Sequence, residues 1–244
     1  MSISETNKEA WNRLVEKKDR WTIPVSPDEI AKARNGDFSL VLTPSKQVPK
    51  SWYPKLQGAD VLCLACGGGQ QGPILSAVGA NVTVFDNSPL QLKQDELVAK
   101  REGLKIRTVE GDMKELSAFE DESFDFIFHP CSNAFCDDIR PVWKEAFRVL
   151  RHKGTLISGF SNPLIYLFDP DLEKQGVLQL KYSAPYSDLT SITEEERKRL
   201  YGDEPLNFSH TLEDQIGGQT EAGFKVRNYN RPFPKSLSYR YLNL

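Results

Sequence analysis

The chain has 244 residues, of which 39% are hydrophobic and 27% are charged, and its formal net charge at pH 7 is −3. This composition is typical of one globular domain with a full core, and it supplies no basic field that would attract nucleic acid. The sequence has no run of 18 apolar residues to span a membrane, and its N-terminus lacks the apolar core of a secretion signal. We therefore expect a cytoplasmic protein.

The first 54 residues predict a small N-terminal helical cap. Residues 4–20 place Trp11, Leu14 and Val15 on one face of a charged helix, and residues 27–34 predict a second short helix. Residues 42–54 are rich in proline and lysine, and this composition predicts a loop.

A change of pattern at Asp60 marks the predicted core of the fold. From there, short apolar runs alternate with helical segments, which is typical of strands joined by crossover helices in a parallel sheet. The predicted strands are 61–65, 82–85, 106–110, 124–129 and 155–160, and the predicted helices between them are 73–78, 89–102 and 140–150. We therefore expect an α/β fold with a doubly wound, mostly parallel sheet, in a single domain whose cofactor-binding core is 55–161.

The segment 162–209 interrupts this alternation, with many Pro, Asp, Tyr and Leu residues and one charged helix at 193–200. An insertion between late strands of an open sheet can cover the carboxyl edge, where such folds bind ligands, so we interpret it as an acceptor lid. The remaining 210–244 predict a helix at 212–222 and strands at 224–229 and 239–244, which would bring the sheet to seven strands.

A glycine-rich turn follows the first core strand. Gly67, Gly68 and Gly69 allow a sharp turn and a close approach of a ligand, because no Cβ intervenes. Asp86, at the end of the next strand, can accept hydrogen bonds from both hydroxyls of a ribose. Together they predict a nucleoside-containing cofactor.

The type of nucleoside cofactor has two interpretations. Gly67, Gly69 and Gly72 also match G-x-G-x-x-G, so an NAD-dependent oxidoreductase is one alternative. Against it, about 60 residues precede the motif, and the sequence has no Tyr-x-x-x-Lys pair for the short-chain proton relay.

Three stretches resemble the class I S-adenosylmethionine-dependent methyltransferases, most closely their broad small-molecule group. They are the glycine-rich 61–69, the acidic strand end 82–86, and the ordered series 110–113, 119–128 and 143–154. The resemblance implies a Rossmann-like methyltransferase fold, S-adenosyl-L-methionine as cofactor, and transfer of its methyl group to a small-molecule acceptor.

The resemblance also implies which residues bind the cofactor. Glycines 67 and 69 would face its methionine part and ribose, Asp86 the ribose hydroxyls, Asp112 and Met113 the adenine, and His129 the region beside the sulfonium. The full implied set is Ala65, Cys66, Gly67, Gly69, Asp86, Asn87, Gly111, Asp112, Met113, His129 and Pro130.

Two residues depart from the family pattern. Cys63 stands where the family usually has an acidic residue, and Ala65 where it usually has glycine. The missing carboxylate commonly helps to hold the amino group of the cofactor, so either another residue does this or binding is weaker. A non-catalytic module that binds adenosylmethionine is therefore a third interpretation.

The candidate catalytic residues lie in 129–135, which follow the fourth core strand and should emerge beside the cofactor. A histidine titrates near neutral pH, so His129 could deprotonate an acceptor, and Asn133 could orient one. The alternatives are that His129 forms a wall of the cofactor pocket and that Asn133 caps the following turn.

Four cysteines complete the list of candidate groups. Cys63 and Cys66 form a C-x-x-C, and Cys131 and Cys136 follow the neighbouring strand, so three thiols could lie near the cofactor. The sequence has no second C-x-x-C to complete a zinc site, and four cysteines are too few for a disulfide framework. We expect reduced thiols and no metal.

Overall fold

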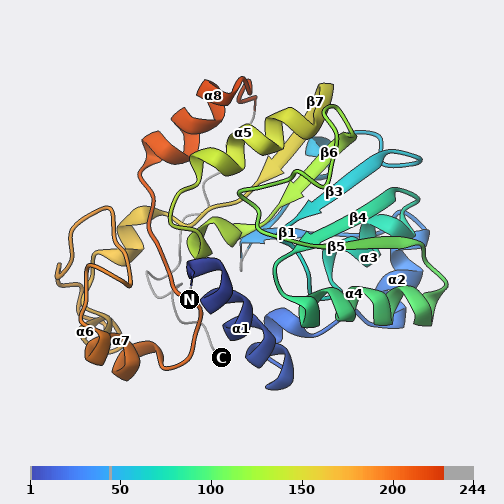
Figure 1. Cartoon of the computed structure of the whole chain (residues 1–244). Coiled ribbons are helices and arrows are strands. Elements are labelled where there is room, and N and C mark those ends of the chain that lie inside the picture. Colours follow the sequence, from blue (N-terminus) through green and yellow to red (C-terminus); the bar gives the residue numbers. More distant parts are fainter. Residues whose placement is uncertain (1, 44–45, 228–244) are drawn as a thin grey trace.

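The computed structural model describes residues 2–43 and 46–227, and its centre is a five-stranded parallel sheet (Figure 1). The strands are β3 (Asp60–Leu64), β4 (Asn81–Asp86), β5 (Ile106–Glu110), β6 (Phe124–His129) and β7 (Leu150–Ser158). They lie in the order β5-β4-β3-β6-β7, so the direction of winding reverses between β3 and β6. Open α/β sheets bind their ligands at the carboxyl edge beside this reversal.

Helices cover both faces of the sheet because its strands are apolar on both sides. Successive strand residues point to opposite faces, so Val61 and Cys63 enter one core while Leu62 and Leu64 enter the other. One face is covered by α2, α3 and α4 and the other by α5 and α8 (Figure 1). These helices are α2 (Pro27–Arg34), α3 (Gln71–Ala77), α4 (Pro89–Glu102), α5 (Arg140–Val149) and α8 (Gly218–Ala222). The doubly wound parallel fold expected from the sequence is confirmed.

Helix α4 matters most for the site, and local signals set both of its ends. The hydroxyl of Ser88 accepts a hydrogen bond from the Gln91 N–H at 3.1 Å, and Pro89 occupies the first helical position. Gly103 ends the helix in the left-handed conformation, with φ at 66°. Because both of its ends are set locally, the position of α4 relative to the turn after β3 is also set.

The two helices predicted in the first 54 residues are present as α1 (Ile3–Glu16) and α2, with a 3₁₀ turn, η1 (Arg20–Thr22), between them, and α2 packs against the sheet. The division into a cap and a core stays a prediction. The prediction of a loop at 42–54 was wrong in part. This segment contains a short antiparallel pair, β1 (Val41–Thr43) and β2 (Lys46–Gln47), followed by η2 (Lys50–Trp52). The pair is local in sequence, with Val41 opposite Gln47 and Thr43 opposite Lys46, and each strand is too short to show an apolar alternation among the proline and lysine residues.

The insertion 162–209 carries a small core of its own. It contains η4 (Pro163–Tyr166), α6 (Pro170–Glu173) and α7 (Glu194–Tyr201), and the rings of Tyr166 and Tyr186 stack at 5.6 Å. Its far end is tied to α1, because Asn7 donates to the carbonyl of Leu206 and accepts the Leu206 N–H at 2.6 Å. Its role as a lid stays a prediction.

The helix predicted at 212–222 is present as a π-helical turn, η5 (Glu213–Gly217), followed by α8. The strand predicted at 224–229 is not formed over 224–227, and its last two residues, like the strand predicted at 239–244, lie outside the described residues. None of the helices in the described ranges combines the length and the apolar character needed to cross a bilayer.

Candidate active site

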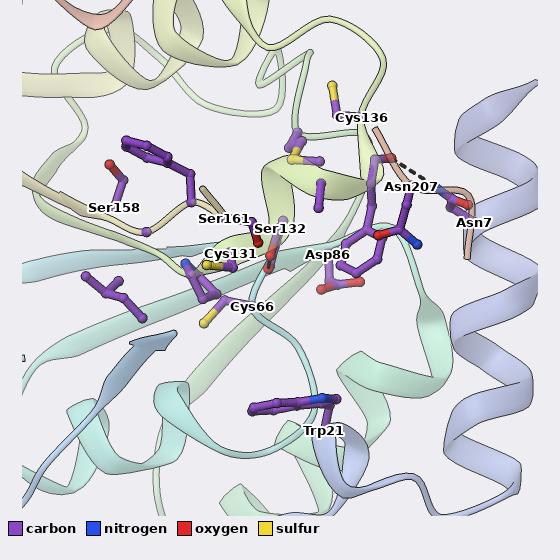
Figure 2. Close-up of a pocket in the computed structure, with 18 of the residues that line it drawn as sticks. Asn7, Trp21, Cys66, Asp86, Cys131, Ser132, Cys136, Ser158, Ser161 and Asn207 are labelled. Atoms are coloured by element: carbon purple, nitrogen blue, oxygen red, sulfur yellow. Dashed lines mark hydrogen bonds between the residues drawn. The ribbon is translucent and has the colours of Figure 1, made fainter. Parts of the chain in front are cut away.

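A cavity of about 710 Å³ lies at the carboxyl ends of all five strands (Figure 2). Residues just after or at the ends of the strands line it, among them Cys66 after β3, Asp86 at the end of β4 and Gly111 after β5. Pro130 after β6 and Ser158 at the end of β7 complete the row. The volume lies within the range of about 300 to 1,000 Å³ that small-molecule sites occupy.

The cavity has two chemically different halves. One half follows β4 and β5 and is lined by Asp86, Asn87 and residues 111–113, and we name it the nucleoside half after the part of the cofactor that the sequence predicts there. The apolar half is lined from 41–52, 131–132 and 158–166. Figure 2 shows Asp86 near Asn7 and Asn207 on one side, and Ser158, Ser161 and Cys131 on the other.

Most of the cofactor residues expected from the sequence are gathered in this cavity. Those that line it are Ala65, Cys66, Gly67, Asp86, Asn87, Gly111, Asp112, Met113 and Pro130. Gly69 does not line the cavity, and its N–H donates to Asp95, which is also outside the cavity. The cofactor roles of the individual residues stay predictions.

Two carboxylates of the chain hold the glycine turn. The Gly67 N–H donates to Asp86 Oδ2 at 2.9 Å. The Gly68 and Gly69 N–H groups donate to Asp95 Oδ2 at 3.0 and 3.1 Å. A dinucleotide site would use such N–H groups for its pyrophosphate, whereas here they are paired within the protein. The turn therefore favours a cofactor without phosphate groups.

Asp95 is the site residue that the sequence reasoning missed. It lies on α4 with no exposed surface, and burial raises the pKa of its carboxyl to about 8, with the nearby Asp86 adding to the rise. Its Oδ1 is buried and has no hydrogen-bond partner among the described residues. One signal was available: Asp95 stands between Leu92 and Val98 in the buried stripe of α4, where a carboxylate is unusual.

Asp86 presents its carboxylate to the cavity from the end of β4 (Figure 2). Its Oδ1 accepts the Ser88 N–H at 2.9 Å, so the side chain is held in one orientation. Burial raises the pKa of this carboxyl, although the N–H groups of Ser88 and Gly67 oppose the rise. The arrangement leaves a fixed acceptor group at the place expected to meet ribose hydroxyls.

The two departures from the family pattern have different structural consequences. Ala65 has a φ of 48°, a left-handed conformation that costs a residue with a Cβ about 1 to 2 kcal/mol. Ser132 Oγ donates to the Ala65 carbonyl at 2.6 Å and holds this conformation. Cys63 is fully buried in the core and does not line the cavity, so the carboxylate beneath the turn comes from α4 instead.

The structure corrects the placement expected for His129 and Asn133. Both side chains are fully buried, and neither lines the cavity. The ring of His129 lies with Nδ1 2.9 Å from the Leu64 carbonyl and Nε2 2.7 Å from Asn133 Oδ1. Asn133 Nδ2 donates to Gln215 Oε1 at 3.0 Å. These residues form a buried polar chain behind the cavity wall rather than a surface for an acceptor.

The reason lies in the alternation of side chains along β6. Phe128 enters the core on the α2–α4 side, so the next residue, His129, points to the opposite face, where its ring meets Trp143 of α5 edge-on at 5.9 Å. Burial lowers the pKa of His129, and its two hydrogen bonds only partly oppose this decrease. The lowered pKa favours the neutral ring.

Three of the four thiols line the cavity: Cys66, Cys131 and Cys136. Burial raises the pKa of Cys66, and it raises those of Cys131 and Cys136 to about 12, so all three are protonated at neutral pH. Within 2–43 and 46–227, no group of three Cys, His, Asp or Glu side chains has an arrangement that could hold a metal ion.

Comparison with known proteins shows the family of the chain. A family model described as a methyltransferase domain matches residues 62–158. A protein of Bacillus subtilis, the uncharacterized methyltransferase YbaJ, is 52% identical over 224 residues, which cover 91% of this chain and 88% of that protein.

Solved structures show a similar fold at low sequence identity. An S-adenosylmethionine-dependent methyltransferase of Mesorhizobium loti has a TM-score of 0.56 at 16% identity, covering 73% of this chain and 80% of that one. A phosphoethanolamine N-methyltransferase of Haemonchus contortus, in complex with S-adenosylhomocysteine, has a TM-score of 0.54 at 14% identity. That match covers 92% of this chain and 44% of the other.

Proposed function

This chain belongs to the class I S-adenosylmethionine-dependent methyltransferases, and we propose that it methylates a small molecule bound in the apolar half of the cavity. S-adenosylmethionine is its cofactor. When bound, this cofactor supplies a methyl group that its sulfonium has already activated.

The observation that supports this function best is the pairing of the glycine turn with two carboxylates, Asp86 and Asp95. The N–H groups of the turn are already paired within the protein, which disfavours the phosphates of NAD, and Asp86 presents its carboxyl group to the cavity. S-adenosylmethionine carries positive charge on its sulfonium and its amino group, and Coulomb attraction favours it beside carboxylates. The residues present therefore fit the cofactor of the family.

The proposed binding roles follow the lining of the nucleoside half. Asp86 would accept hydrogen bonds from the ribose hydroxyls, the carboxylate of Asp112 would accept from the adenine amine, and the thioether of Met113 would lie against the adenine ring. Methyl transfer asks the protein to hold the acceptor in line with the breaking bond and to exclude water. Walls from the cap, the sheet edge and the insertion can do both.

Calorimetric titration tests this function. We expect S-adenosylmethionine and S-adenosylhomocysteine to bind with micromolar affinity and NAD(H) not to bind. Asp86→Ala should weaken S-adenosylmethionine by about 1 to 3 kcal/mol, roughly 5- to 150-fold, because hydrogen bonds to a charged group are lost. Asp37→Ala, which removes an exposed carboxylate outside the cavity, is the matched control. Binding of NAD(H) alone, or unchanged affinity of Asp86→Ala, would overturn the assignment.

A further inference from the structure

Two buried acceptor atoms beside the glycine turn are not used by any hydrogen bond among the described residues. They are Gln91 Oε1 and Asp95 Oδ1. Both side chains come from α4 and approach glycines of the segment 67–72. A Cβ added to Gly68 would lie 3.2 Å from Gln91 Oε1, and one added to Gly72 would lie 3.0 Å from Asp95 Oδ1. A buried acceptor without a partner is costly, so two at one turn point to a donor that the protein itself does not supply.

Gln91 is the one of these two residues that reaches the cavity. Its side chain lines the cavity although it is only 4% exposed, whereas Asp95 does not line it. The backbone of Gln91 is fixed, because its N–H donates to Ser88 Oγ at 3.1 Å and its carbonyl accepts the Gly68 N–H at 3.1 Å. No hydrogen bond with another described residue holds its carboxamide. The carboxamide can therefore turn about its Cγ–Cδ bond and present its oxygen to a ligand.

The carbonyl of Trp21 lies beside the same carboxamide. The Cβ added to Gly68 would lie 2.9 Å from this carbonyl oxygen, and Trp21 also lines the cavity (Figure 2). Gln70 holds this part of the cap, because its Nε2 donates to two carbonyls of the segment 20–23 at 3.1 and 3.0 Å. When the carboxamide of Gln91 turns its oxygen to the cavity, its NH₂ group takes the place beside the Trp21 carbonyl. That orientation puts a donor, in place of an acceptor, next to a carbonyl oxygen.

The pairing of the turn decides which kind of ligand group fits there. The N–H groups of Gly67, Gly68 and Gly69 already donate to carboxylate oxygens of the protein. A ligand carboxylate would need such donors, whereas an ammonium group brings three N–H donors of its own. Hydroxyl groups also donate, but the ribose hydroxyls are expected at Asp86, which meets the turn at Gly67. The unused acceptor beside Gly68 therefore favours an ammonium group.

We propose that the carboxamide oxygen of Gln91 accepts a hydrogen bond from the ammonium group in the methionine part of S-adenosylmethionine. This inference rests on the proposed methyltransferase function and names the residue that holds one end of its cofactor. Cys63 does not serve here, because it is buried in the core and does not line the cavity. A hydrogen bond from a charged donor is stronger than one between neutral groups, so its loss is measurable as a change in affinity.

Three ligands that share the adenosine part isolate this contact. They are S-adenosylhomocysteine, its deaminated analogue, which keeps the carboxylate, and 5′-methylthioadenosine, which lacks the whole amino-acid part. Calorimetry measures each on the unaltered protein and on Gln91→Met, whose unbranched side chain has a similar length and no amide. We expect Gln91→Met to weaken S-adenosylhomocysteine roughly 10- to 150-fold and the other two ligands less than threefold. Gln94→Met, on the same helix and outside the cavity, is the matched control and should leave all three affinities unchanged.

Other patterns of loss would place Gln91 elsewhere. An equal loss for S-adenosylhomocysteine and 5′-methylthioadenosine would mean that Gln91 meets the ribose. A loss that the deaminated analogue shares and 5′-methylthioadenosine does not would mean that it meets the carboxylate. Either pattern, or no loss for S-adenosylhomocysteine, would overturn the proposal. If the unaltered protein binds neither S-adenosylmethionine nor S-adenosylhomocysteine, the proposed function fails instead.

A second variant, Gln91→Glu, tests whether this side chain accepts or donates. Glutamate has nearly the same shape and keeps an acceptor oxygen, but an ionised carboxylate cannot donate. We expect S-adenosylhomocysteine to bind this variant within threefold of the unaltered protein or more tightly, and the deaminated analogue to bind it more weakly, because its remaining charge is negative. Weakening of S-adenosylhomocysteine by more than threefold would show that Gln91 donates through Nε2, and the proposal would be wrong. This result decides even if the methionine variant does not fold.

Discussion

Replacing Asp95 with asparagine isolates the effect of the buried carboxyl beneath the glycine turn. The side chain has no exposed surface, and its Oδ2 accepts the N–H groups of Gly68 and Gly69 at 3.0 and 3.1 Å. Asparagine has nearly the same shape and keeps an oxygen acceptor for both, but it cannot ionise. Asp95→Asn therefore removes the titration and leaves the packing.

The size of the effect follows from the raised pKa. Burial, with a contribution from Asp86, raises the pKa of Asp95 from 3.8 to about 8. Between these values the folded protein binds more protons than the unfolded chain, so the free energy of unfolding decreases as pH rises. The slope approaches about 1.4 kcal/mol per pH unit, which gives a loss of roughly 4 kcal/mol between pH 5 and pH 8. The asparagine variant lacks this loss.

Urea denaturation followed by circular dichroism at pH 5, 6, 7 and 8 would measure this effect on both proteins. We expect the unfolding free energy of the variant minus that of the unaltered protein to increase by several kcal/mol from pH 5 to pH 8. Other titrating groups cancel in this difference. Asp37→Asn, at an exposed position, should show a difference near zero throughout. A constant difference for Asp95→Asn would refute the reasoning, because it would mean that Asp95 is ionised over the whole range.

Two further substitutions test the packing and the backbone conformation of residues around the cavity. Asn133→Ala should lower the free energy of unfolding by about 2 to 4 kcal/mol, because the buried His129 ring and the buried Gln215 amide both lose a hydrogen-bond partner. Urea denaturation measures this change, and a decrease of less than about 0.5 kcal/mol would contradict the buried chain of hydrogen bonds. Ala65→Gly should raise the free energy of unfolding by up to about 1 kcal/mol, since glycine adopts a φ of 48° without strain. A decrease in the melting temperature of this variant would show that packing of the Ala65 Cβ outweighs the strain.

The core of the fold was predictable because its signals are local. Alternating apolar runs identified β3 to β6, and β7 begins at Leu150, earlier than the predicted 155, because α5 ends at Val149. The glycine turn and the acidic strand end needed no tertiary contact to be seen. They depend on the absence of a side chain at Gly67, where a Cβ would lie 2.8 Å from the Cβ of Gln91, and on the position of Asp86 one strand later, and both residues line the cavity.

The sequence by itself thus determined the sheet, the family and the strand ends that surround the cofactor. Tertiary structure decided which side chains face the cavity. His129 ends β6, and the alternation of that strand turns its ring toward Trp143 and away from the acceptor. Asp95 meets the glycine turn from a helix 26 to 27 residues further along the chain. Periodicity encodes which face of an element is buried, whereas the partner that a buried polar group meets depends on packing between distant segments.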